Sequence, residues 1–406
     1  MWFMADSNES IPGPLHGIRV LELGNYIAAP TTGRLLADFG AEVIKVERPG
    51  TGDELRNWRL YAGTTSMLFR TVNRNKKSIV VDLKSDEGRE VVLGIARSCD
   101  VVLENFRPGT LERWGLGPED LDAVNDKVVV VRISAFGQTG PMAGQPGFAA
   151  VAEAAGGLRH LVGDPDRPPS RVGVSIGDSI AGLFGAFGVV MTLFAQGRSA
   201  VPVALEQRVI DVALNESVLS MMESLVPDYL AYGTERVRTG GRMEGIAPSN
   251  AYGCSDGASV VVAGNGDAIF RRYMAVIGRE DLALRADLQT NAGRWAARDE
   301  LDDAITDWTG ARSRDEVLTA LGEAGIPAGP INTAADICVD GQLLSRNMIQ
   351  FFDVDAGAEQ PKRVGFTGIV PVIGGRSRPI DAVGPDLGQH TAEVLAELAR
   401  RPAAAR

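Results

Sequence analysis

The sequence predicts an α/β fold, with a doubly wound parallel sheet over about the first 200 residues and a smaller α/β block after it. The first observation is an apolar run at 18–23 that ends at a glycine. The second is a helical pattern at 31–39 followed by an apolar run at 42–47, so that strand, helix and strand fit within about 30 residues. The third is the repetition of this rhythm as far as residue 133, which is typical of parallel strands covered by helices.

Local signals place the individual elements. Gly24 ends the first strand, and Pro30 stands where a helix starts, because the first helical turn needs no backbone N–H donor from it. Leu35 and Leu36 share the apolar face of that helix, and Gly40 ends it. The later elements of this domain are predicted as strands at 78–83, 100–103 and 127–133 and a helix at 86–97.

The pattern changes after the first domain. The stretch 209–233 is rich in leucine and methionine and predicts one long helix, whereas the polar, glycine-containing stretch 234–250 predicts a loop. The remainder, 331–397, contains short strands and a final helix that we expect to pack on the first domain. Between these parts, a second α/β block is predicted from a strand at 259–263 and helices at 268–277, 298–309 and 314–324.

Composition excludes several classes of protein. The 406 residues are 45% hydrophobic and 23% charged, which excludes a disordered or collagen-like chain. Lysine and arginine number 41 against 52 acids, a net charge of −11, so we expect no nucleic-acid partner. The 3 cysteines lie far apart, which predicts neither a disulfide framework nor a zinc site and fits the reducing cytoplasm.

Membrane and targeting signals are weak. The opening segment carries acids where a signal peptide carries lysine or arginine. The stretch 179–197 has no charged residue and approaches the length of a membrane span. Its glycines at 182, 185 and 188 allow close packing against protein, so we interpret it as a buried helix and expect no membrane partner.

Few residues are candidates for chemistry. The three histidines, His16, His160 and His390, have no metal-ligand spacing and no neighbouring nucleophile, which favours structural roles and no metal site. The first strand–helix turn reads GNYIAAP and lacks the later glycines that bring backbone close to a dinucleotide pyrophosphate. A nicotinamide cofactor is therefore not expected.

Asp178 is the acid with the most unusual position, between Gly177 and Ser179 at the start of the uncharged helix. Aspartate at this place serves as an N-cap. The same place also stabilises the carboxylate as an anion, by about 0.3–1 kcal/mol through the helix macrodipole. An ionised carboxylate is a competent covalent nucleophile, and attack on a thioester would give a mixed anhydride. The residues alone leave both interpretations open.

Seven segments stand out together, in chain order LHGIRVLELGNYIAAPTTGRLLADFGAEVIKVERPGTGD, NRNKKSIVVDLK, ENFRPGTLERWG, SAFGQTGP, IGDSIAG, GIPAGPI and LGQHT. Together they resemble the class III CoA-transferases, the CaiB/BaiF family. The resemblance implies transfer of CoA from an acyl-CoA thioester to a free carboxylic acid, through an aspartate that becomes an acyl anhydride and then an aspartyl-CoA thioester. The matching aspartate is Asp178, so the resemblance favours the nucleophile over the N-cap.

The resemblance implies a Rossmann-like large domain built from both chain ends, 15–225 and 331–406, with a small α/β domain inserted at 226–330. It also implies a homodimer of two interlocked, ring-like chains, in which the inserted domain of one chain helps to cover the site of the other. Coenzyme A is then a substrate, and no permanently bound cofactor is expected.

The resemblance also implies residues that contact CoA. Arginine and lysine among them would supply donors to its phosphates on an otherwise acidic protein. Ile27 and Ala28 match positions that line the pantetheine and thioester end. The full set is Ile27, Ala28, Arg48, Val81, Lys84, Asn105, Phe106, Arg107, Arg113 and Phe148.

The sequence departs from formyl-CoA transferases at the substrate end of the site. Those enzymes carry Gln, Tyr and an acid where this sequence has Ile27, Phe148 and Ala149, and four consecutive glycines where it reads TGGRMEG. A small polar acid such as oxalate would lose hydrogen-bond partners here. We expect a larger or more apolar acid, for example a dicarboxylate held by Arg238, Arg242 or Asn250.

Two other functions fit parts of the pattern. The 2-methylacyl-CoA racemases share this fold and CoA site, but they use a His–Asp pair in a GHD segment where this sequence reads Gly147-Phe148-Ala149. Proton removal and return need a base on each face of the carbon, and one base is missing. A non-catalytic CoA-binding protein is disfavoured because Asp178 and its glycine neighbour are present.

Overall fold

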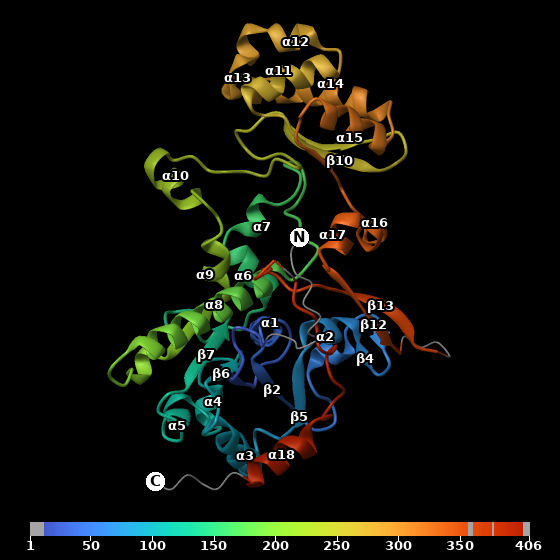
Figure 1. The fold of residues 1–406 in the computed structure, drawn as a ribbon. Coiled ribbons are helices and arrows are strands. Elements are labelled where there is room, and N and C mark those ends of the chain that lie inside the picture. The colour runs from blue at the N-terminus through green and yellow to red at the C-terminus, as the bar shows by residue number, and fades with distance from the viewer. Residues whose placement is uncertain (1–11, 356–359, 376, 401–406) are drawn as a thin grey trace. The chain divides into compact units, whose positions relative to one another are not determined.

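The structure, a computed structural model, describes residues 12–355, 360–375 and 377–400 (Figure 1). The chain divides into two compact units. The larger unit contains the chain up to Gly157, the stretch Gly173–Met222 and the chain from Gly341 onward. The smaller unit contains Leu158–Val172 and Glu223–Asp340.

A six-stranded parallel sheet forms the centre of the larger unit, in the order β5-β2-β1-β6-β7-β8. The chain builds outward from β1 to β2 and β5, then returns to place β6 on the other side of β1. In open parallel sheets, such a reversal marks a ligand-binding crevice beyond the carboxyl ends of the two strands at which the order switches, here β1 and β6. The strands are β1 (Arg19–Glu22), β2 (Glu42–Glu47), β5 (Lys76–Val80), β6 (Val101–Glu104), β7 (Val129–Ser134) and β8 (Val209–Ala213).

Alternate residues of the strands face two different helical layers. Val101 and Leu103 of β6 belong to one apolar core with residues of α1 and α8, whereas Val102 belongs to a second core with residues of α3 and α18. The doubly wound sheet predicted from the sequence is therefore confirmed. The helices of this unit are α1 (Ala28–Asp38), α2 (Met67–Val72), α3 (Asp86–Ala96), α4 (Thr110–Arg113), α5 (Pro118–Asp122), α6 (Ala149–Ala155), α8 (Ile176–Arg198), α9 (Leu214–Leu219), α17 (Gly341–Ser345) and α18 (Thr391–Arg400).

One predicted element is wrong. The stretch 209–233 is not one helix, because its first five residues, VIDVA, form β8 and pair with β7 at the edge of the parallel sheet. Its β-branched residues favour a strand, and pairing with a neighbour outweighs the helical spacing of the leucines. The helices α9 and α10 (Leu225–Tyr232) take up only the rest of the stretch. By contrast, β2 and β10 have the predicted bounds.

Helix α8 has two different faces. A Cβ atom added at Gly182 would lie 2.7 Å from Cβ of Thr31, and one at Gly185 would lie 2.6 Å from Oγ1 of Thr32, so α1 packs directly on its glycines. The opposite face is apolar but exposed in the single chain, which corrects the expectation of a fully buried helix. Its exposed residues are Leu183, Phe187, Val190, Met191 and Phe194.

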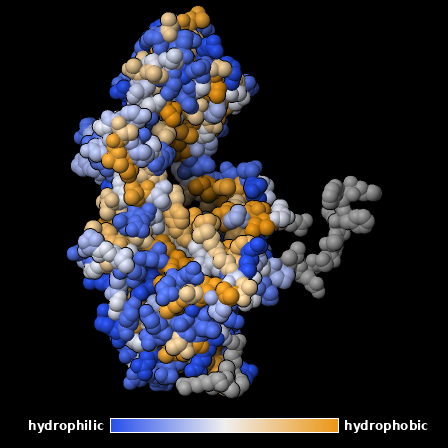
Figure 2. Space-filling view, turned by 90° about the vertical axis from the view of Figure 1, so that its left-hand side faces the viewer, coloured by the Kyte–Doolittle hydropathy of each residue, from blue (hydrophilic) through white to orange (hydrophobic). Residues whose placement is uncertain are grey.

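Figure 2 views the side toward which α8 extends in Figure 1, and apolar residues lie there between hydrophilic ones. By length and composition, α8 is the one candidate for a membrane span in the described part of the chain. Only 33% of its most apolar window is buried inside the structure.

The smaller unit has its own antiparallel sheet, in the order β11-β10-β9, and its own apolar core around Phe270, Tyr273 and Leu301. Its strands are β9 (Ser249–Gly253), β10 (Ser259–Ala263) and β11 (Ala328–Pro330). Its helices are α7 (Leu158–Leu161), α10, α11 (Asp267–Val276), α12 (Glu280–Leu284), α13 (Asn291–Ala296), α14 (Arg298–Gly310), α15 (Arg314–Glu323) and α16 (Ala334–Val339). Two short hairpins complete the larger unit: β3 (Tyr61–Ala62) with β4 (Thr65–Ser66), and β12 (Ile349–Val354) with β13 (Lys362–Thr367).

Candidate active site

Most of the residues predicted to contact CoA follow the carboxyl ends of neighbouring strands. Arg48 follows β2, Val81 and Lys84 follow β5, and Asn105 to Arg107 follow β6. Because these strands are parallel, their carboxyl ends meet at one edge of the sheet. These residues therefore lie along one edge of the sheet, at which the strand order switches between β1 and β6.

The turn after β1 has an uncommon backbone conformation that other strands support. Tyr26 has φ of 64°, which is rare for a residue other than glycine. Its N–H donates to Oδ1 of Asp53 at 3.0 Å, and Nζ of Lys45 donates to the carbonyl of Gly24 at 2.7 Å. The Asn105 amide bonds both the N–H and the carbonyl of Asn25, at 2.8 and 2.7 Å. The buried Ile27 and Ala28 are therefore held in a fixed position at the start of α1.

A fully buried ion network lies beneath this turn. Lys45 pairs with Glu22 at 3.1 Å and with Asp53 at 2.9 Å, and Lys76 pairs with Glu22 at 2.7 Å. Burial alone would lower the pKa of Lys45, but the carboxylates of Asp53 and Glu22 outweigh it and hold that pKa above its usual value. Burial lowers the pKa of Lys76 to about 8, because Glu22 compensates it only in part. Sequence reasoning missed this network.

Asp178 lies in the first turn of α8 rather than at its N-cap, which corrects the capping interpretation. Ser175 is the N-cap and makes no side-chain capping bond, and Asp178 is the third residue of the helix. The Asp178 side chain is half-buried, and the helix macrodipole stabilises its carboxylate. One turn further on, a Cβ at Gly182 would lie 2.9 Å from the carbonyl of Ala28. The start of α8 and the turn after β1 are thus neighbours.

A second acid, Glu153 of α6, lies beside Asp178 in the fold and was not predicted. It is 1% exposed, and its Oε1 accepts from the N–H of Gly177 at 3.4 Å. The only sequence signal is its spacing of four residues from the buried Ala149, which puts both on one face of α6. Glu153 thus contacts the residue that immediately precedes Asp178.

The cationic residues predicted to contact CoA differ in their hydrogen-bond and ion-pair partners. Arg48 pairs with Glu54 at 2.6 Å, and Arg113 donates to Oγ1 of Thr110 at 2.9 Å. Lys84 and Arg107 are exposed, and their side chains have no hydrogen-bond or ion-pair partner in the described chain. These two cations are therefore available to an anionic ligand.

Aromatic side chains surround the turn after β1. The Tyr26 ring lies 5.8 Å from that of Trp58 and 5.9 Å from that of Phe148, the latter edge to face. Phe148 is 68% exposed although Ala149, which follows it at the start of α6, is buried. Phe106 packs edge to face on Trp114 at 5.1 Å. Two of the predicted residues, Phe106 and Phe148, thus present apolar rings at this edge.

The histidines have structural surroundings. Nδ1 of His390 accepts from the N–H of Ser78 at 3.1 Å, and burial lowers its pKa. His160 lies 3.8 Å from the exposed Glu235. Within the described residues, no group of three or more histidine, cysteine or acidic side chains is arranged to hold a metal ion.

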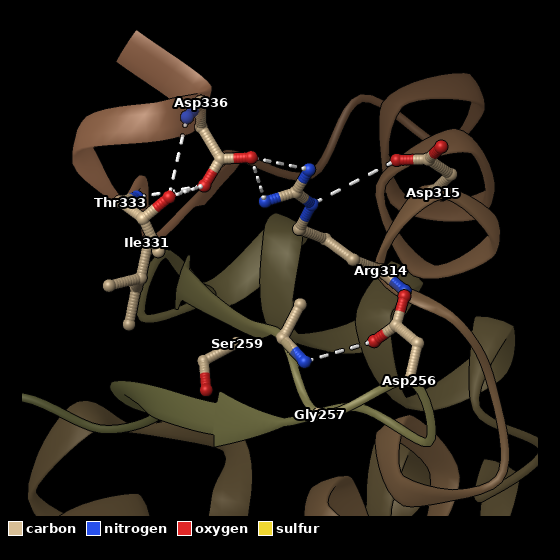
Figure 3. Close-up of a pocket in the computed structure, with 9 residues that line it drawn as sticks. Asp256, Gly257, Ser259, Arg314, Asp315, Ile331, Thr333 and Asp336 are labelled. Atoms are coloured by element: carbon tan, nitrogen blue, oxygen red, sulfur yellow. Dashed lines mark hydrogen bonds and ion pairs between the residues drawn. The ribbon is translucent and has the colours of Figure 1, made fainter.

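The smaller unit has a polar cavity of about 550 Å³ near the start of α15 (Figure 3). Both terminal nitrogens of Arg314 lie 3.2 Å from Oδ1 of Asp336, and Asp256 accepts from the backbone N–H of Arg314 at 3.0 Å. No predicted site residue lines this cavity, and its one arginine is already paired.

A second cavity of about 550 Å³ in the same unit is lined by all three residues predicted to hold the acceptor acid. Arg242 pairs with Asp302 at 2.6 Å, and Nδ2 of Asn250 donates to the same carboxylate at 2.8 Å. Arg238 instead donates to the backbone carbonyls of Asp164 and His160, at 3.2 Å each. Of the two arginines, Arg238 is the one that has no carboxylate partner among the described residues.

Comparison with known proteins identifies the family. The sequence profile of CoA-transferase family III matches residues 15–391. The chain belongs to CoA-transferase family III. It is an enzyme, a CoA-transferase, as the names of its relatives support. Its α/β fold with a parallel central sheet matches that of a solved CaiB/BaiF family protein from Brucella suis, with a TM-score of 0.83 and 33% identity over 96% of this chain and 100% of that one.

The curated relatives of this transferase have names that state their reactions. The chain is 42% identical over 395 residues, 97% of its length and 96% of the relative's, to succinyl-CoA–D-citramalate CoA-transferase of Chloroflexus aurantiacus. It is 33% identical to succinate–glutarate CoA-transferase of Agrobacterium fabrum, covering 95% of this chain and 96% of that one. The resemblance drawn from the sequence motifs is confirmed.

Proposed function

We propose that this transferase moves CoA between dicarboxylic acids, with Asp178 as the covalent nucleophile. The relatives act on succinyl-CoA with citramalate and on succinate with glutarate, according to their names. Each of these acids carries two carboxylates. The absence of the formyl-CoA transferase residues at Ile27, Phe148 and Ala149 supports a larger acid than oxalate or formate.

The reaction needs four balanced steps at one carboxylate. The Asp178 carboxylate attacks the thioester carbonyl, and the CoA thiolate leaves, which gives a mixed anhydride. The thiolate attacks the aspartyl carbonyl and releases the donor acid, which gives an aspartyl-CoA thioester. The acceptor carboxylate attacks this thioester and releases the thiolate again. The thiolate then attacks the acyl carbonyl of the second anhydride, which forms the new acyl-CoA and frees Asp178.

The single observation that carries this mechanism is the position of Asp178. It lies in the first turn of α8, one turn from the contact between Gly182 and the carbonyl of Ala28. The helix macrodipole stabilises a carboxylate at this place, which favours the form that acts as a nucleophile. The crevice supplies complementary features for CoA, with Lys84 and Arg107 as free cations for phosphates and the buried Ile27 and Ala28 toward the thioester.

The proposal includes a homodimer and a cytoplasmic location, with no permanently bound cofactor. The exposed apolar face of α8 supports a second copy of the chain as its cover, because exposed faces of this kind mark interaction surfaces. We also propose that the smaller unit corresponds to the inserted domain of the family. The three cysteines are free, which supports a reducing compartment.

Asp178→Asn tests the mechanism, because the amide has the same size and is not a nucleophile. We expect transfer from succinyl-CoA to a panel of free dicarboxylic acids, followed by mass spectrometry of the thioesters, to fall by roughly 10³-fold or more. Binding of CoA should persist in this variant. Undiminished transfer by the variant would refute the role of Asp178. Incorporation of α-deuterium from heavy water into a 2-methylacyl-CoA would instead favour a racemase.

A further inference from the structure

We propose that the cavity beside loop 237–244 of the smaller unit binds a hydroxy-dicarboxylate, with Arg238 and Arg298 holding a carboxylate and Glu244 accepting a hydroxyl. The proposal rests on the proposed function, because it names the acid that the transferase would use. The cavity measures about 550 Å³, which suffices for a small organic acid. Its lining also includes Trp295, Gly240, Gly241 and Asn250.

The first observation is that two guanidinium groups in the lining have no carboxylate partner among the described residues. Arg238 donates only to two backbone carbonyls, at 3.2 Å each. Arg298 donates to the carbonyl of Trp295 at 3.1 Å and stacks on its ring at 5.0 Å. Both side chains are half-buried. Guanidinium groups that are positioned by neutral partners retain the charge and the free N–H donors that bind a carboxylate.

The second observation concerns Glu244, which lines the same cavity. Its Oε2 atom is buried and has no hydrogen-bond partner within the described residues. An unsatisfied buried acceptor is unfavourable until a donor reaches it. A ligand carboxylate has no proton to donate at neutral pH, whereas a hydroxyl next to a carboxylate does. The cavity therefore favours a hydroxy acid over its unsubstituted analogue.

The third observation is the close approach of backbone in the loop. A Cβ at Gly241 would lie 2.5 Å from Oδ1 of Asn250, and Gly240 has φ of 67°. These glycines let loop 237–244 lie directly on β9, which fixes Arg238 and Glu244 relative to Arg298 at the start of α14. The cavity of Figure 3 differs, because its Arg314 is already neutralised by Asp336.

Anionic groups could come from the free acid or from a phosphate of CoA, and kinetics separate the two. We would measure KM for the acceptor acid and KM for acyl-CoA in Arg238→Gln and Arg298→Gln, together with the affinity of the full-length protein for succinate and malate by calorimetry. We expect each variant to weaken succinate and malate binding by about 10- to 100-fold, the usual cost of losing a charged hydrogen bond. KM for acyl-CoA should change less than about twofold.

The chain offers a matched control for each variant. Arg272 donates to two backbone carbonyls at 3.1 Å, as Arg238 does, and Arg312 stacks on Trp308 at 4.6 Å while donating to its carbonyl, as Arg298 does. Neither control residue lines the cavity. Arg272→Gln and Arg312→Gln should leave both affinities unchanged. Glu244→Met should lower malate affinity to that of succinate.

The outcomes distinguish this site from the transferase mechanism. Unchanged acid affinity in Arg238→Gln and Arg298→Gln, in a protein that transfers CoA, would overturn the site and leave the mechanism intact. A rise in KM for acyl-CoA alone would assign the arginines to phosphate and also overturn it. Loss of acid binding in these variants, in a protein without transferase activity, would support the site and refute the mechanism.

Discussion

The charged groups beneath the turn after β1 and those around the cavity of the smaller unit are arranged in opposite ways. Lys45 is fully buried and bonds two carboxylates and a backbone carbonyl. Arg238 and Arg298 are half-buried and bond only backbone carbonyls. The first arrangement uses up the charge within the protein, whereas the second leaves charge available. We therefore expect the paired charges to maintain the fold and the charges without a carboxylate partner to meet a ligand.

Lys45→Met should have the largest effect on stability in this comparison. It leaves the buried Asp53 carboxylate without its ion-pair partner and leaves Glu22 with Lys76 alone, which costs about 3–5 kcal/mol of the free energy of unfolding. Chemical denaturation measures the loss. Lys77→Met is the control, since Lys77 pairs with Glu42 and Glu393 at the surface, where an ion pair contributes about 1 kcal/mol or less. An equal loss of unfolding free energy in the two variants would contradict the distinction between buried and exposed ion pairs.

Glu104 tests in a pH-dependent way how burial of a charged group affects the stability of the fold. Burial raises its pKa to about 7 although Arg132 bonds it at 2.8 Å. Between the ordinary glutamate pKa and pH 7 the folded state then holds more protons than the unfolded state, so the free energy of unfolding falls as pH rises through this window, by up to about 3 kcal/mol. Glu104→Gln should remove this component. Parallel stability curves for the two proteins between pH 4.5 and 7 would show that Glu104 titrates normally.

Gly182→Ala tests whether the packing of α8 on α1 is as close as the structure describes. The added methyl group would meet Thr31 at 2.7 Å, and crowding of this kind costs about 1–3 kcal/mol. Gly197 of the same helix has no neighbour near its Cβ position, so Gly197→Ala should be neutral or stabilise by about 0.5–1 kcal/mol. Thermal and chemical denaturation of both variants would check the contrast. A neutral Gly182→Ala would mean that α1 and α8 separate without cost.

Arg238→Gln should have the smallest effect on stability, below about 1 kcal/mol, because the side chain is partly exposed and bonds only neutral carbonyls. Denaturation under the conditions used for Lys45→Met measures it. A loss similar to that of Lys45→Met would make Arg238 a structural residue and remove the difference between the two regions.

Local sequence patterns were sufficient to predict most strands of the sheet. They were insufficient to predict the buried ion pairs between those strands. The segment EVIKVE has the predicted bounds of β2, because apolar residues between two breaks define a strand. Nothing in that segment marks Lys45 as buried, since its partners Glu22 and Asp53 belong to other parts of the chain. The same limit applies to β8, which is a strand because β7 lies beside it.

The candidate site divides in the same way. Asp178 stood out in the sequence because an acid begins an uncharged helix, and it lies in the first turn of α8, although not at the N-cap. The contact of Gly177 with Glu153 of α6 joins distant parts of the chain, so no local pattern showed it. Arg298 could not be predicted as a partner of Arg238, because 60 residues of chain separate them and the cavity alone relates them. Sequence motifs indicated the candidate residues, and only the fold showed which other residues lie near them.

The contact between α1 and α8 also constrains how this enzyme evolves. Thr31 and Thr32 occupy the space that side chains at 182 and 185 would need. A larger residue on either helix is tolerated only if the facing residue shrinks in the same lineage, so substitutions at these four positions should occur in pairs. Asp178 and the turn after β1 flank this contact, and its slow divergence would keep their spacing constant.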